Sequence, residues 1–137
     1  MRSCGGMCRP PQLRISYVPQ DASFVQGSLK SFAAGRGIDE SLFRAVLHRF
    51  GFERGQLDTD MAEFSAGQKK KSLLAASLCE EAHLYVWDEP LNYIDVISRV
   101  QIEELILEYR PSLIFVEHDQ VFTDRVATTI VDLDQGV

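Results

Sequence analysis

Two neighbouring carboxylates end a short apolar run in this sequence. Leu84 to Trp87 are all apolar, and Asp88 and Glu89 follow directly before Pro90. In nucleotide hydrolysis, the first acid of such a pair suits coordination of Mg²⁺ through water, and the second can orient or deprotonate the attacking water. The alternative is a strand that runs into an acidic surface turn, because short motifs often occur by chance.

A second candidate begins with a turn of small residues. Ser65, Ala66 and Gly67 precede Gln68 and the lysines at positions 69–71, and a helix is predicted to begin there. Lysines in the first turn oppose the helix dipole by about 0.3–1 kcal/mol each. A phosphate anion bound to the free backbone N–H groups, Ser65 and the nearby cations would offset that conflict. The alternative is a solvated basic helix start with no ligand.

Two other polar residues come just after predicted strands. His118 follows the apolar run 113–116, and Gln20 follows the run 13–18 after Pro19. A lone histidine is more often a surface or structural residue than a functional one, so His118 gains weight only from its setting. His48 and His83 have no such setting, and we assign them no chemistry.

Alternating helices and strands must position these residues. The patterns predict strands over 13–18, 84–87, 113–116 and 129–133, and helices over 39–50, 68–79, 95–109 and 120–127. Asp39 is the expected N-cap of its helix, with Ile38 and Phe43 as a hydrophobic staple and Gly51 as the stop. The fold class is therefore α/β, with parallel strands covered on both faces by flanking helices and a short helical insert. Ligands of such sheets bind at the carboxyl edge, where Asp88, Glu89 and His118 should lie.

Bulk properties restrict the class further. The chain has 137 residues, of which 45% are hydrophobic, so one globular unit is expected, with residues 1–12 as an irregular lead-in. A net charge of -6 argues against nucleic-acid binding through overall charge. The sequence has no membrane-length apolar run and no secretory signal, which predicts a cytoplasmic location. Cys4, Cys8 and Cys79 lack zinc spacing, and Cys79 should behave as a small hydrophobe.

Taken in order, these segments resemble the motifs of ATP-binding cassette (ABC) ATPases. Val18-Pro19-Gln20 resembles the Q-loop, Ser65-Ala66-Gly67-Gln68 the signature, Trp87-Asp88-Glu89-Pro90 the Walker B motif, Leu91 to Asp95 the D-loop, and Glu117-His118-Asp119 the H-loop. The resemblance implies a partial P-loop NTPase fold, with residues 13–137 as the C-terminal portion of an ABC ATP-binding domain. The short insert and the Gly-Gln-Lys-Lys-Lys signature helix are similar to those of ABC-F proteins, soluble tandem ATPases that act on the ribosome. Residues 102–107 and 115–119 resemble the second domain of antibiotic-resistance members of the Lsa and Vga type.

The resemblance also implies residue roles, with ATP and Mg²⁺ as cofactors. Glu89 would be the catalytic base, Asp88 a Mg²⁺ ligand through water, and His118 a contact to the γ-phosphate. Gln20 would contact the metal or the attacking water. The signature would act in trans on ATP held by a second ABC domain in head-to-tail pairing, and Asp95 would lie in the loop that links the two sites. The trans-acting residues would be Ser65, Ala66, Gly67 and Gln68, although Ala66 replaces a usual glycine and puts a methyl group near the γ-phosphate.

One expected motif has no match in the sequence. No G-x-x-x-x-G-K-[S/T] occurs, so the chain should bind ATP poorly in cis and be inactive alone, as a fragment or truncated product would be. Two alternatives stay open. The chain could belong to the ATP-binding subunit of a membrane transporter, or it could be a non-catalytic module that lends its signature to a complete ABC domain.

Overall fold

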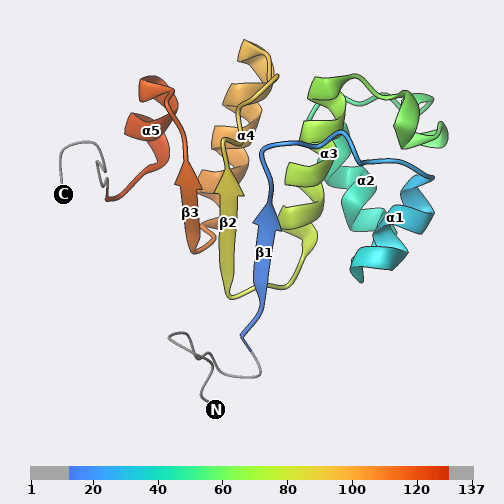
Figure 1. Cartoon of the computed structure of the whole chain (residues 1–137), viewed down its shortest axis with the longest axis horizontal. Coiled ribbons are helices and arrows are strands. Elements are labelled where there is room, and N and C mark those ends of the chain that lie inside the picture. The colour runs from blue at the N-terminus through green and yellow to red at the C-terminus, as the bar shows by residue number, and fades with distance from the viewer. Residues whose placement is uncertain (1–12, 130–137) are drawn as a thin grey trace.

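The sheet at the centre of the molecule is entirely parallel. In the computed structural model, which describes residues 13–129, the strands β1 (Ile15–Val18), β2 (Leu84–Asp88) and β3 (Leu113–Val116) lie in the order β1-β2-β3. All three arrows point the same way in Figure 1. The predicted common carboxyl edge is therefore confirmed. The lead-in over 1–12 and all but the first residue of the strand predicted over 129–133 lie outside the described residues.

Local signals begin and end the helices close to where the sequence predicts. A two-helix insert follows β1, comprising α1 (Leu29–Arg36) and α2 (Glu40–Arg49), and the side chain of Asp39 accepts a hydrogen bond from Leu42 N. Ile38 and Phe43 are both buried. Short 3-10 turns over Gln56–Asp58 and Met61–Glu63 then lead to α3.

The longer helices cover the sheet. α3 (Ala66–Cys79) begins with a capping box in which Ser65 and Gln68 bond each other's backbone N–H groups. α4 (Val96–Tyr109) is capped by Asp95, and α5 (Gln120–Val126) by Asp119. α3 and α4 both start at the carboxyl edge of the sheet and run back along the same face (Figure 1). None of the helices described within residues 13–129 is long and apolar enough to cross a bilayer.

The prediction that helices cover both faces of the sheet is wrong for the described residues. Strand register places Val18, Trp87 and Phe115 on the face that packs into the core, where Val18 and Trp87 are fully buried. On the other face, Tyr17 and Ile114 are 49% and 57% exposed. An apolar strand run predicts that both faces of the strand are buried, but it does not identify the segment that covers each face.

Candidate functional site

Three loops bring the predicted site residues to one edge of the sheet. Gln20 follows β1, Asp88 ends β2 with Glu89 after it, and His118 follows β3. Because the strands are parallel and in register, the predicted gathering of Asp88, Glu89 and His118 at the carboxyl edge is confirmed, and the structure places Gln20 at the same edge. Gln20 and His118 are exposed, while Asp88 and Glu89 are half-buried.

The two carboxylates of the Walker B-like motif differ in backbone conformation. Asp88 is the last strand residue, and Glu89 has φ 47°, in the left-handed region that non-glycine residues rarely adopt. Glu89 N donates to Val116 O at 2.8 Å, which ties the strained residue to β3. Neither carboxylate has a side-chain hydrogen bond or ion pair with another residue of the described range 13–129.

The donor set fits a magnesium ion held mainly by water and phosphate. Among the described residues no group of three or more His, Cys, Asp or Glu could hold a metal by itself. Mg²⁺ in phosphate-transfer sites is usually held by one or two carboxylates together with substrate oxygens and waters. Asp88, with Gln20 beyond the neighbouring strand, matches that requirement.

Glu117 joins the loops that follow β2 and β3, a role that sequence reasoning missed. Its Oε1 accepts from Leu91 N at 3.2 Å, and its Oε2 accepts from His118 N at 3.0 Å and from Asp119 N at 3.2 Å. These bonds fix the backbone of His118 relative to the segment after Glu89. The only sequence signal was an acid directly before the predicted histidine.

The signature turn is closely packed in cis. A Cβ built on Gly67 would lie 2.5 Å from the backbone oxygen of Tyr93, in the D-loop-like segment before α4. Asp95 accepts hydrogen bonds from Ser98 N at 3.1 Å and from Ser98 Oγ at 2.7 Å. The hydrogen bond from the Ser98 hydroxyl is the main reason that the pKa of Asp95 lies below its ordinary value. The signature-like turn and the D-loop-like segment therefore pack directly against each other.

In this structure the lysine run bonds groups within the chain, and its part in a phosphate-binding site at the start of α3 stays a prediction. Lys69 Nζ donates to Ser23 O at 3.2 Å, and Lys71 Nζ donates to Ser98 Oγ at 3.2 Å and to Phe50 O at 3.4 Å, at the end of α2. Lys70 is fully buried and also bonds backbone carbonyls. Acceptors within the chain therefore surround these ammonium groups, including backbone carbonyl oxygens and the Asp95 carboxylate, which lies 4.0 Å from Lys71 Nζ.

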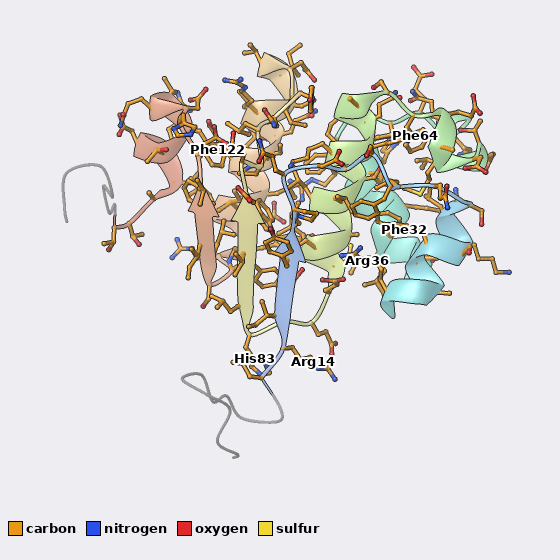
Figure 2. The ribbon with its side chains drawn as sticks, viewed as in Figure 1. Arg14, Phe32, Arg36, Phe64, His83 and Phe122 are labelled. Atoms are coloured by element: carbon orange, nitrogen blue, oxygen red, sulfur yellow. The ribbon has the colours of Figure 1, made fainter. Side chains whose placement is uncertain are left out.

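Two cavities lie at the edge opposite the candidate site. One cavity is lined by His83 and another by Arg14, and Arg14 N donates to His83 Nδ1 at 2.9 Å (Figure 2). Both residues lie at the amino ends of the strands. These two cavities therefore lie at the end of the sheet opposite the candidate site.

Comparison with known proteins agrees with this geometry. The chain is 35% identical over 97 residues to the ATP-binding protein Uup of Haemophilus influenzae, and 30% identical over 93 residues to ABC transporter F family member 2 of Arabidopsis thaliana; these matches cover 71% and 68% of the chain but only 14% of each relative. It is 29% identical over 141 residues to the zinc import ATP-binding protein ZnuC of Pseudomonas entomophila, covering 97% of the chain and 54% of that protein. The chain thus spans about a seventh of the first two relatives and about half of the third.

Solved structures show the same fold. A putative cobalt transport ATP-binding protein aligns with TM-score 0.68 and 20% identity over 82% of this chain and 44% of that one. The archaeal ribosome recycling factor aABCE1 aligns with TM-score 0.66 and 24% identity over 87% of this chain and 25% of that one. The family profile described as ABC transporter matches residues 5–92, more than half of the sequence. The chain therefore belongs to the ABC transporter family, in its ATP-binding domain.

Proposed function

We propose that this chain supplies the hydrolytic edge and the signature of an ABC-F-type ATPase that uses ATP and Mg²⁺. The observation that carries the proposal is the convergence of Gln20, Asp88, Glu89 and His118 on the carboxyl edge of one parallel sheet. The start of α3 lies at the same edge, beside Tyr93. The candidate signature and hydrolytic residues therefore lie at the same edge of the fold.

Each residue has a role that its position supports. Asp88 holds Mg²⁺ through water, and Glu89 accepts the proton of the attacking water. His118 contacts the γ-phosphate, and Gln20 contacts the metal or the water. ATP supplies the phosphoanhydride bond that is broken, and Mg²⁺ neutralises charge on its phosphates.

The signature acts on a different nucleotide. Ser65, Ala66, Gly67 and Gln68 close over ATP held by a second ABC domain, paired head to tail, and Asp95 lies where the two sites meet. The amides of Ala66 and Gly67 have no acceptor among the described residues and are available to a phosphate. The capping box of Ser65 and Gln68 shapes this helix start before any ligand arrives.

The ABC-F assignment rests on the relatives and on the insert. One relative is named an ABC transporter F family member, and one solved relative is a ribosome recycling factor. The insert between Gln20 and Ser65 contains two short α-helices, α1 and α2, followed by two 3-10 turns. We therefore favour a cytoplasmic, ribosome-associated protein of the ABC-F class. Within that class we favour the antibiotic-resistance type, which residues 102–107 and 115–119 resemble.

The experiment compares ATP turnover of the 137-residue chain with that of the longest natural polypeptide that contains it. The printed residues lack G-x-x-x-x-G-K-[S/T], so we expect no turnover from the chain alone and Glu89-dependent turnover from the longer polypeptide. Robust turnover by the 137-residue chain would contradict the expectation that the chain binds ATP poorly and is inactive alone. Sedimentation of the ATP-bound Glu89→Gln protein with ribosomes tests the ABC-F class, and co-purification with a membrane permease would favour the transporter alternative.

A second candidate function is a non-catalytic module that lends its signature to a complete ABC domain. The preformed capping box at Ser65 and the missing phosphate-loop motif favour it. ATP-dependent capture of an intact ABC domain, unaffected by Glu89→Gln, would support this reading over the hydrolytic one.

A further inference from the structure

Lys70, near the candidate site, is buried and bonded to backbone carbonyls, which its position in a run of three lysines does not predict. Lys70 lies in the first turns of α3 between two more accessible lysines, yet its side chain is fully buried. Its Nζ donates to Pro19 O and Gln20 O, both at 2.8 Å, and to Asp88 O at 3.4 Å. A lysine is almost never fully buried without specific partners.

The partners match the charged form of the side chain. An ammonium has three N–H donors and no acceptor, and three carbonyl oxygens surround this one. A neutral amine would lose one donor and would direct a lone pair at a carbonyl oxygen. Charge-assisted hydrogen bonds are also stronger than neutral ones.

The position of these carbonyls explains why a side-chain donor is needed. The ladder between β1 and β2 ends at the pair Val18 and Trp87. The next residue, Pro19, has no N–H and cannot extend the ladder, so the two chain segments would separate there. Lys70 supplies donors from α3 at the point where backbone donors run out.

The segments joined in this way carry the candidate hydrolytic residues. Gln20 is one of the bonded residues, Asp88 is another, and Glu89 is adjacent to it. We propose that Lys70 is a positioning residue, which holds the Q-loop-like segment against the end of β2 and thereby fixes Gln20 relative to Asp88 and Glu89. The reaction served by this arrangement is the one under "Proposed function", so the catalytic part of the inference rests on that proposal.

The consequence is a link between the two nucleotide sites. α3 begins with the signature that would serve a partner's nucleotide, and the same helix places Lys70 at the hydrolytic edge of its own domain. A shift of α3 when a partner's nucleotide binds would therefore move the carbonyls of Gln20 and Asp88 together. Lys69, one residue earlier, bonds only Ser23 O among the described residues and provides a matched control.

The first test needs no nucleotide and uses the 137-residue chain. Carbonyl ¹³C shifts of Pro19, Gln20 and Asp88 are measured in wild type, Lys70→Met, Lys70→Arg and Lys69→Met. We expect Lys70→Met to shift all three upfield, Lys70→Arg to restore them in part, and Lys69→Met to leave them unchanged. Unchanged carbonyls in Lys70→Met, or equal changes in Lys69→Met, would overturn the proposal.

A wild-type measurement covers the case in which Lys70→Met does not fold. The Lys70 ammonium should give a slowly exchanging ¹⁵N signal at neutral pH, correlated through its hydrogen bonds with those carbonyl carbons. Exposed lysine ammonium protons exchange with water too quickly to be seen. Absence of such a signal from the folded chain would overturn the proposal.

The catalytic part is tested on the longest natural polypeptide that contains the chain. Lys70→Met should lower kcat about 10- to 100-fold with little change in KM, because misplaced hydrolytic groups affect the transition state more than ATP binding. Lys70→Arg should recover part of the loss. An unchanged kcat overturns the positioning role, whereas no turnover from wild type overturns the proposed function and leaves the carbonyl result standing.

Discussion

Gly67 and Tyr93 approach so closely that the structure has no space for a side chain at position 67. An ideal Cβ on Gly67 would lie 2.5 Å from the carbonyl oxygen and 3.6 Å from the carbonyl carbon of Tyr93. The obstructing atoms are backbone, and Tyr93 itself has φ 67°. Gly67 therefore allows the D-loop segment to pack on the start of α3, a local role that is separate from any contact with a partner's nucleotide.

Gly67→Ala should destabilise the chain by about 1–3 kcal/mol, the usual cost of overpacking a site that cannot relax easily. Urea unfolding measures the loss. The matched control is Gly35→Ala in α1, where an added Cβ meets nothing within 4 Å. Alanine is favoured over glycine within helices by about 1 kcal/mol, so the control should gain stability. Equal effects at the two glycines would contradict the close approach.

Glu89 should show a trade-off between activity and stability. In the turnover-competent polypeptide, Glu89→Gln should lower kcat by about 10²–10⁴, the usual contribution of a general base. Glu89→Gly should be inactive but more stable by about 0.5–1 kcal/mol, because relief of the left-handed conformation, about 1–2 kcal/mol, exceeds the added unfolded-state entropy. Single-turnover kinetics and urea unfolding measure the two effects. A Glu89→Gly variant less stable than wild type would show that the conformation at φ 47° stores no strain.

Local sequence signals predicted most of the elements because each depends on near neighbours. Asp39 caps its helix as the sequence indicates, the helix predicted from Asp95 begins one residue later with Asp95 as its cap, and the strand over 113–116 has the predicted bounds. The residues at the carboxyl edge followed from strand direction alone. Caps, periodicity and parallel connections are properties of short segments, so sequence reasoning reaches them.

The features that sequence did not predict depend on distant contacts. A lysine within a run of lysines looks solvated, and only the packed structure shows that Lys70 is buried against carbonyls at the end of β2 and just after β1. Glu117 was similarly invisible, because its partners Leu91 and Asp119 lie in different loops. The uncovered face of the sheet is the same kind of error, since apolar periodicity indicates burial without naming the covering segment.

Asp95 should make stability depend on acid pH. Its hydrogen bond from Ser98 holds the folded pKa below the ordinary value of 3.8, so its contribution is complete above pH 3.8 and is lost as pH falls through the lower folded pKa. Asp95→Ala should cost about 1 kcal/mol at pH 7 through loss of the N-cap, and less as the pH falls below 3.8. Urea unfolding at pH 7 and at a pH below 3.8 measures the change in this cost, and Glu104→Ala, at an exposed position, is the control. A constant cost across this range would contradict the assignment.

Cys79 should be chemically inert in the folded chain. Burial raises the pKa of its thiol from 9.0 to about 12, so almost no thiolate forms near neutral pH. Iodoacetamide at pH 8, followed by mass spectrometry of the Cys79 peptide, should show labelling only in urea. This site-specific readout keeps Cys4 and Cys8 from contributing. Rapid labelling under native conditions would show that the end of α3 opens readily.

The uncovered face of the sheet should promote self-association of the 137-residue chain. Tyr17, Val86 and Ile114 are paired across the strands on that face, and Tyr17 and Ile114 are largely exposed. Replacing Tyr17 and Ile114 by threonine removes apolar surface but keeps a residue that favours strands. The double variant should scatter less light at high concentration, with stability within about 1 kcal/mol of wild type. Phe115→Thr, on the covered face, should instead destabilise the fold without reducing association. The Phe115 ring packs edge-on against the Phe122 ring, with 5.3 Å between the ring centroids.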